Sequence, residues 1–458
     1  MPGKELFPPG EGVPNADTVL YITAKTTRTC YQRNNHITLA YSGYCQLDQY
    51  DRPIAGYINF CPYLIRATNM TQEKVYMGDP EKSLALQEEV KTMLTKAKLV
   101  IYYCSVVHEL FHALGFSKGL FDKFRDCSHS VEGNCPRRMS RVVREIYGVT
   151  RLVTSSVIRH AQEHFGCLTE ERFGGPLHVE NGVVSSHWSQ KLMYGSIMAP
   201  KLGMAHQTVV DPLTLAFFED TGWYKVDYDQ AGQYLWGKDT GCKFGFHESC
   251  QRDSRFFCKT GNGKSCHYLH KDKGHCKTVD RYCGMVESDQ GDQCFLPITN
   301  TKVSGLEKYS QSSLCFMSNL TMSGNDFAPL EGMCLQHRCD VKQTLEVKVE
   351  SSAWIVCPYG HTINVPGYHG YVKCPDSKEA VCPLVEETVD MTTVKDSTTM
   401  TPETTTWTET SSVINVSHIS TIHIQTTKQE KALSSGCTWK SQLHTFIIIL
   451  HSTVFMFW

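Results

Sequence analysis

The sequence predicts an α+β fold in which a mixed helix-and-strand part precedes a disulfide-rich C-terminal domain. Segments rich in β-branched and aromatic residues come before a long apolar run without proline, a pattern typical of strands packed on a buried helix. Thirteen of the 21 cysteines lie between Cys242 and Cys382, among glycines and short polar segments. Such a composition favours a loop-rich domain held by disulfides. A chain of 458 residues is long enough for two or three domains.

The first elements fall within residues 1–116. The stretches "TVLYITAKT" at 18–26 and "AGYINF" at 55–60 are rich in strand-forming residues. The stretch "KAKLVIYYCSVVHELFHALGF" at 96–116 is largely apolar and meets its first glycine at Gly115. It therefore predicts a buried helix that ends near this glycine.

That helix carries a polar set, His108, Glu109 and His112, inside its apolar run. Residues four apart share a helix face, so the two histidines can offer imidazole nitrogens to one metal ion. Glu109 lies one step round the helix and is suited to deprotonate a metal-bound water. The histidines could instead be core residues with hydrogen-bonded rings, but metal-free packing gives no reason for polar groups there. The pattern favours a hydrolytic zinc site.

A catalytic zinc with an open coordination position needs a third protein ligand. In the compact pattern H-E-x-x-H-x-x-G-x-x-H the last histidine would stand at Lys118, whose ammonium group cannot bind the metal at neutral pH. The stretch "SSHWSQKLMYGSIMAPKLG" at 185–203 supplies His187, and Met198 follows before Ala-Pro. This arrangement resembles the methionine turn beneath the zinc of metzincins. We predict His187 as the third ligand.

Other histidines are rivals for this position. His160 and His164 are four apart in an amphipathic stretch, but Ala161 stands where the catalytic glutamate would be. We expect them on the surface or in a groove. His178 and His206 are single histidines in loop-like sequence, where solvated residues are more common than ligands.

The combined pattern resembles the leishmanolysin family of metzincins, whose members carry a long insertion before the third histidine. The matching positions are His108, Glu109, His112, Gly115, His187 and Met198. The similarity extends through "RPIAGYINFCP" at 52–62, "HFGC" at 164–167 and "LAFFEDTGWY" at 215–224, and covers most of residues 17–385. It implies a metzincin-type catalytic domain that binds one Zn²⁺ per chain.

The resemblance also implies the roles of these residues. The protein would be a zinc-dependent metalloendopeptidase in which Glu109 activates zinc-bound water and Met198 shapes the floor beneath the metal. Some metzincins carry a tyrosine two residues after this methionine, but this chain has Pro200, so the oxyanion-stabilising residue is not predicted. Family members begin with a signal peptide and an inhibitory pro-segment. Because residues 1–25 contain no apolar signal segment, we expect the N-terminal part to be truncated.

The resemblance and the composition together predict five regions. An incomplete N-terminal catalytic subdomain (1–116) ends in the zinc helix, and a central subdomain (117–226) contains the third ligand and the methionine turn. A cysteine-rich domain (227–385) precedes a Ser/Thr-rich stalk (386–436), which cannot bury a core. Residues 437–458 end in a short apolar tail.

The cysteines and sequons indicate an oxidising compartment. The odd count between Cys242 and Cys382 requires at least one cysteine to pair outside that region or to stay free. N-glycosylation sequons occur at Asn69, Asn319 and Asn415. We therefore predict a secreted protein or one on the extracellular face of the plasma membrane.

The C-terminal tail predicts attachment to a lipid. Small residues at Ser434, Ser435 and Gly436, a polar spacer and a thirteen-residue apolar end fit a GPI-anchor signal. The apolar end is too short for a spanning helix, which needs about 20 residues.

The net charge of the chain argues against nucleic acid as a partner. A net charge of −2 without blocks of like charge implies no nucleic acid, so the expected partners are protein or peptide substrates. An edge strand beside the zinc helix would hold an extended peptide through backbone hydrogen bonds. The alternative function is a catalytically silent cell-surface adhesion protein on a protease scaffold. The oligomeric state is not predicted.

Overall fold

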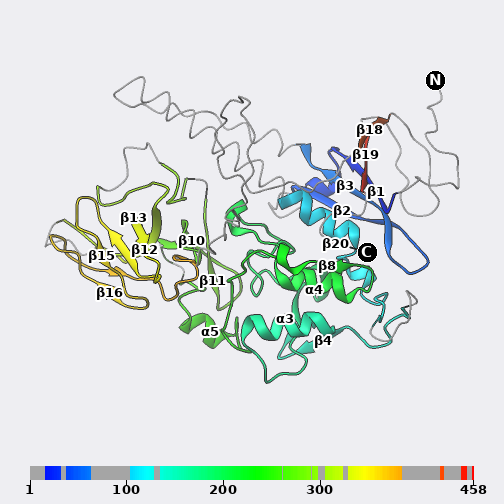
Figure 1. The fold of residues 1–458 in the computed structure, drawn as a ribbon, viewed down its shortest axis with the longest axis horizontal. Coiled ribbons are helices and arrows are strands. Elements are labelled where there is room, and N and C mark those ends of the chain that lie inside the picture. Colours follow the sequence, from blue (N-terminus) through cyan, green and yellow to red (C-terminus); the bar gives the residue numbers. More distant parts are fainter. Residues whose placement is uncertain are drawn as a thin grey trace, which may run out of the picture.

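The structure is a computed structural model of the chain, drawn in Figure 1. It describes residues 16–31, 38–62, 104–127, 135–259, 261, 263–289, 291–297, 305–322 and 328–383. For residues 251–252, 423–427, 445–450 and 456–457 only the backbone is described. A mixed helix-and-strand part and a β-rich part lie side by side along the longest axis (Figure 1).

The N-terminal sheet brings together strands from both ends of the chain. Strand β1 (Thr18–Thr23) runs parallel to β3 (Pro53–Phe60), and β2 (Ala40–Leu47) pairs antiparallel with β3. On the other side of β1 lie β19 (Thr445–Leu450) and β18 (His423–Thr427), giving the order β18-β19-β1-β3-β2. Strand β2 is therefore an edge of the described sheet, as expected for one strand beside the zinc helix.

The predicted zinc helix, helical from 104 to 114, packs on this sheet. Leu20 of β1, Ile58 of β3 and Ala113 of the helix form a small buried cluster. A Cβ atom at Gly56 would lie 3.0 Å from the Cβ atom of Ala113, so the glycine allows strand and helix to approach closely. The sheet thus fixes the position of the helix face that carries the histidines.

The central part contains an antiparallel four-stranded sheet of order β4-β5-β6-β7 and two helices that contact each other, α3 and α4. Strand β7 carries His187 into the site. A short strand, β20 (Met456–Phe457), pairs with β8. The elements are η1 (Arg28–Cys30), η2 (Lys118–Leu120), β4 (Val143–Ile146), β5 (Val149–Leu152), α3 (Ser155–Phe165), β6 (Gly175–Glu180), β7 (Val183–Trp188), η3 (Ala205–Gln207), α4 (Pro212–Asp220), β8 (Lys225–Val226) and η4 (Tyr228–Gln230).

An aromatic core joins the zinc helix to these central elements. Phe116, just past the helix, stacks on Phe217 of α4 with ring centroids 4.2 Å apart and meets Trp188 of β7 edge-on at 5.0 Å. All three side chains are fully buried. Helix α3 is held against α4 because Asp220 accepts a hydrogen bond from the free backbone N–H of Val157 at 2.9 Å.

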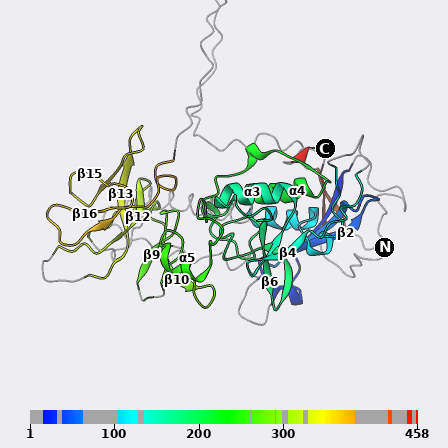
Figure 2. The same cartoon turned by 90° about the horizontal axis from the view of Figure 1, so that it is seen from below.

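The C-terminal part is built from a three-stranded sheet, β11-β10-β9, and a six-stranded sheet, β15-β14-β13-β12-β17-β16. Figure 2 shows this part beside α3 and α4 from a second direction. It has its own hydrophobic cluster, which includes Leu314, Phe316 and Leu335. The elements are α5 (His247–Arg252), β9 (Lys264–Cys266), β10 (Lys273–Thr278), β11 (Gly284–Glu287), β12 (Ser313–Ser318), β13 (Glu331–Cys339), β14 (Leu345–Lys348), β15 (Ile355–Val356), β16 (Thr362–Ile363) and β17 (Val372–Lys373).

Nine disulfides join pairs of described cysteines. Twelve of the thirteen cysteines from Cys242 to Cys382 pair among themselves, and Cys242 pairs with Cys167 at the end of α3. This outside pair resolves the odd count in the sequence and ties the two parts together. The pairs are Cys30–Cys61, Cys127–Cys135, Cys167–Cys242, Cys250–Cys283, Cys258–Cys276, Cys266–Cys315, Cys294–Cys334, Cys339–Cys382 and Cys357–Cys374.

The mixed architecture confirms the predicted α+β class with a disulfide-rich C-terminal part. The predicted domain boundaries stay predictions.

Among described residues, helices are too short or too polar to cross a membrane. Asn319 is half-buried after β12, whereas the other two sequons and the three anchor candidates lie outside the described residues. The glycosylation and anchor assignments therefore remain predictions.

Candidate metal centre

The helix that carries the first two histidines ends where the sequence predicts. Gly115 has a φ of +134°, a backbone conformation that residues with a Cβ rarely adopt. A Cβ atom there would lie 3.1 Å from the ring of Trp223. The glycine thus lets the chain leave the helix directly beneath the histidines and turn into the aromatic core.

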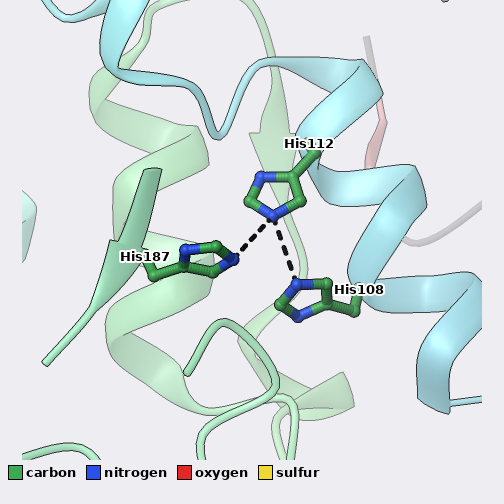
Figure 3. Close-up of side chains that lie close together, drawn as sticks. All are labelled: His108, His112 and His187. Carbon is green, nitrogen blue, oxygen red and sulfur yellow. Dashed lines mark hydrogen bonds between the residues drawn. The ribbon is translucent and has the colours of Figure 1, made fainter. Parts of the chain in front are cut away.

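Three histidines converge from two elements (Figure 3). The zinc helix supplies His108 and His112, and β7 supplies His187. The Nε2 atom of His112 lies 3.2 Å from Nε2 of His108 and 3.1 Å from Nε2 of His187. This is the only group of three or more His, Cys, Asp or Glu side chains with metal-binding geometry among the described residues. The structure therefore brings together the three residues predicted as ligands.

Hydrogen bonds fix the tautomers of the two helix histidines. His108 donates its Nδ1–H to the backbone oxygen of Ile197 at 2.5 Å, and His112 donates its Nδ1–H to that of Phe116 at 2.7 Å. Because a carbonyl oxygen only accepts, each neutral ring carries its proton on Nδ1 and a lone pair on Nε2. The two Nε2 lone pairs then face each other, which is unfavourable without a cation between them.

The spacing fits a zinc ion. Tetrahedral zinc with bonds of about 2.0–2.1 Å to nitrogen separates its ligand atoms by about 3.3 Å. The two Nε2 contacts of His112, with His108 at 3.2 Å and with His187 at 3.1 Å, are close to this value. Three neutral imidazoles and one open position are also the donor set of many catalytic zinc sites.

Burial keeps these imidazoles neutral. Desolvation lowers the pKa of His108 to about 4 and that of His112 to about 3. Desolvation also lowers the pKa of His187, and the neighbouring rings of His112, His108 and His178 lower it further. Neutral rings at physiological pH present free lone pairs to a metal.

Glu109 lies beside the histidines and is almost fully buried. Its Oε2 is 2.7 Å from the hydroxyl oxygen of Ser42 on β2, which is also 2.7 Å from the backbone oxygen of Glu109. Desolvation raises the pKa of this carboxyl group to about 7, against a smaller lowering by the Ser42 hydrogen bond. Such a carboxyl group can exchange a proton near neutral pH.

The predicted methionine turn is hydrogen-bonded to the elements that carry the histidines. Met198 is fully buried, and its backbone oxygen accepts a hydrogen bond from the backbone N–H of Trp188, next to His187. Ile197, one residue earlier, supplies the oxygen that orients His108. The turn is therefore hydrogen-bonded through its main chain to one predicted ligand, His108, and to the residue that follows another, His187.

A buried carboxylate holds this turn in place. Asp211 accepts hydrogen bonds from the hydroxyls of Ser196 at 2.5 Å and Thr214 at 2.8 Å, and from the backbone N–H of Thr214 at 2.9 Å. The Ser196 hydroxyl in turn accepts from the backbone N–H of Met198 at 3.2 Å. Asp211 also caps the start of α4.

We expect Asp211→Ala to lower the free energy of unfolding by about 3 kcal/mol, because two buried hydroxyls and a helix cap lose their acceptor. Urea denaturation followed by circular dichroism measures this change. Asp227→Ala is the control, since Asp227 accepts only local hydrogen bonds at an exposed 3-10 helix. Its expected cost is about 0.5–1 kcal/mol. Equal losses in both variants would contradict a special role for Asp211.

None of the rival histidines belongs to this group of three. His164 contacts the backbone oxygen of Trp236 at 2.8 Å, and His160 stacks on Tyr228. His206 lies in η3, 2.7 Å from Asp272, and His178 lies in β6. The expectation of loop positions for the last two was wrong, because short polar strands and 3-10 turns leave little periodicity in the sequence.

Two residues that shape the site were not predicted from the sequence, Ser42 and Asp211. Ser42 reaches Glu109 across 67 positions, a contact that requires the sheet. Asp211 precedes Pro212, and an aspartate before proline is a recognisable helix start. That signal indicates a cap but not the hydrogen bond to the methionine turn.

Comparison with known proteins identifies a matching family. A family model described as leishmanolysin matches residues 83–285 and 278–388. The chain is 34% identical over 393 residues to the ciliated left-right organizer metallopeptidase of Mus musculus, covering 81% of this chain and 52% of that protein. It is 34% identical over 391 residues to the protein of the same name from Danio rerio, covering 81% and 56%.

A leishmanolysin-like peptidase of Drosophila melanogaster is also similar. It is 30% identical over 277 residues, which cover 53% of this chain and 35% of that protein. The chain spans about half the length of the first relatives it matches. These comparisons concern proteins named as peptidases or metallopeptidases, in agreement with a metal site built from histidines.

Proposed function

Because this chain belongs to the leishmanolysin family of metallopeptidases, we propose that it is a zinc-dependent endopeptidase acting on proteins outside the cell or at its surface. The observation that carries the proposal is the convergence of three imidazole Nε2 atoms beside a buried carboxyl group. His108, His112 and His187 would hold the zinc, and Glu109 would be the general base. A binding protein has no need of this carboxyl group.

Zinc bound by these histidines would supply a Lewis acid that polarises the peptide carbonyl. Glu109 then takes a proton from the attacking water and passes it to the leaving amine nitrogen. Its raised pKa of about 7 suits both steps, because the group can accept and donate a proton near neutral pH. Ser42 holds the carboxyl group against β2 while the proton moves. Met198 closes the floor of the site without contributing a ligand.

Strand β2 offers a place for an extended substrate. It pairs with β3 along one edge, and its other edge has no strand partner among the described residues. Ser42 of this strand touches Glu109, so a peptide added along β2 would run past the proposed general base. Backbone pairing of this kind accepts many sequences, which suits an endopeptidase of broad specificity.

The disulfides support a location outside the cytosol, where such bonds form and persist. Within the proposal, Ser434, Ser435 and Gly436 remain the candidate attachment sites of a lipid anchor that would hold the enzyme at the cell surface. Release of the protein from cells by a phospholipase specific for GPI anchors tests this part separately.

The proposed activity is tested by metal analysis and casein cleavage on the purified chain. We expect about one zinc per chain, and loss of cleavage when a chelator such as 1,10-phenanthroline removes the metal. Cleavage should return when zinc is added back. A folded chain that binds zinc but does not cleave casein or a mixed peptide library would favour the silent adhesion scaffold.

A further inference from the structure

The third proposed ligand is held differently from the other two. The Nδ1 atoms of His108 and His112 each donate to a backbone oxygen, which orients their rings. The only hydrogen-bond contact of the His187 ring with the described part of the chain joins its Nε2 atom to Nε2 of His112. Metal-binding histidines usually have a hydrogen bond at the second ring nitrogen that holds the ring in place. The position of His187 therefore depends more on the strand that carries it, β7.

Residues on both sides of His187 contact the segment that follows the zinc helix. The backbone N–H of Lys118 donates a hydrogen bond to the Ser186 hydroxyl at 3.0 Å. Trp188 meets Phe116 edge-on at a ring-centroid distance of 5.0 Å, and both of these side chains are fully buried. The two segments therefore lie against each other, with His187 between the two contacts.

The Lys118 N–H needs an acceptor from outside its own helix. Lys118 is the first residue of η2, and the first N–H groups of a helix have no acceptor within that helix. Ser117, directly before η2, makes no side-chain hydrogen bond that would cap it. Ser186, 68 positions further along the chain, supplies the acceptor instead. Its hydroxyl thus caps η2 and joins it to β7.

This bond connects the two elements that carry the proposed ligands, because η2 begins four residues after the zinc helix ends at 114. We propose that Ser186 is a positioning residue for the metal centre, whose hydroxyl holds β7 against η2 and keeps His187 within reach of the two helix histidines. This inference rests on the proposed function, since it concerns the same metal centre. Lys118 stands where the compact pattern has its third histidine, and here its main chain holds the strand that carries the distant ligand.

Loss of this bond should lower the fraction of molecules in which β7 is correctly placed. The apparent dissociation constant of a ligand rises as its binding-competent fraction falls. One hydrogen bond between uncharged groups corresponds to about 3- to 10-fold in an equilibrium constant. We therefore expect Ser186→Ala to raise the dissociation constant for zinc about 3- to 10-fold, measured by titration against a chromophoric chelator. Ser186→Thr keeps a hydroxyl and should restore the parent affinity.

Lys118→Pro removes the same bond from the donor side. Proline has no N–H and fits the first position of a helix. The residue before a proline must be extended, and Ser117 has a φ of −140° and a ψ of 132°. The variant should weaken zinc binding by the same factor as Ser186→Ala, and the double variant should bind no more weakly than either single variant. Lys118→Ala keeps the N–H, so its zinc affinity should stay within about twofold of the parent.

Ser185→Ala is the matched control on the strand itself. The Ser185 hydroxyl oxygen is buried and has no hydrogen-bond partner among the described residues, so its removal should change zinc affinity by less than about twofold. Near-ultraviolet circular dichroism on each variant checks that the fold is retained.

Zinc affinity separates this inference from the proposed function. A parent chain that binds zinc but does not cleave peptides would contradict the peptidase, and the titrations would still decide the role of Ser186. Unchanged affinity in Ser186→Ala and Lys118→Pro, an equal loss in Ser185→Ala, or additive losses in the double variant would each overturn the inference. A parent chain without zinc affinity would overturn both.

Discussion

Replacement of Glu109 by glutamine is expected to lower kcat about 10²- to 10⁴-fold, the usual contribution of a general base. Glutamine has nearly the same shape and keeps a polar contact with Ser42, so the helix should remain packed on the sheet. Its amide oxygen cannot take a proton from the attacking water. Zinc content should stay at about one per chain, because Glu109 is not a proposed ligand. Metal analysis and peptide kinetics on the same sample measure both quantities.

The matched control is Glu163→Gln on α3. Its carboxylate is 58% exposed and contacts only His160 at 3.9 Å, so kcat should change by less than about twofold. Full activity in Glu109→Gln would exclude this residue as the base. Loss of zinc together with activity would instead indicate that Glu109 organises the histidines. In either case the assignment of roles on the helix would have to change.

The same variant separates the protease from an adhesion protein. If cells adhere to the parent chain through a binding surface, Glu109→Gln should support adhesion equally well. If adhesion depends on proteolysis, it should fall with cleavage. If the parent chain does not cleave peptides but cells still adhere to it, the protein would use the protease scaffold for binding only.

The sequence predicts the parts of the site that depend on local spacing. His108 and His112 are four apart on an apolar helix, so helix geometry alone places their rings on one face. Gly115 predicts the end of that helix, and in the structure this glycine has a positive φ. His187 is different, since it comes from β7, and only the resemblance to a known family singled it out among the histidines.

Contacts that depend on the sheets were not predictable from the sequence. Ser42 meets Glu109 because β2 is placed beside the helix by pairing with β3, and no local pattern encodes that placement. The cysteines were predictable only in part. The odd number from Cys242 to Cys382 requires a partner outside that region or a free thiol, but only the fold identifies Cys167 as the partner.

Removal of the third imidazole by His187→Ala is expected to weaken zinc binding at least about 100-fold and to abolish chelator-sensitive cleavage. Losing a direct ligand should cost more than losing an outer-shell hydrogen bond, which typically costs 10- to 100-fold. The two helix histidines would remain, but two nitrogens do not complete a catalytic site. Zinc titration against a competing chromophoric chelator measures the affinity.

The fold should survive this change, because His187 lies at the site while the neighbouring Trp188 carries the core packing. Near-ultraviolet circular dichroism tests that point, and His361→Ala, at an exposed histidine of the C-terminal part, serves as the control. A folded His187→Ala chain with full zinc content and cleavage would show that the third ligand is another residue. Since the described residues contain no second group with metal-binding geometry, that ligand would have to come from outside them or from a rearranged site. Joint loss of zinc and cleavage, with the fold intact, would instead establish that a ligand 75 positions beyond His112 completes the metal centre.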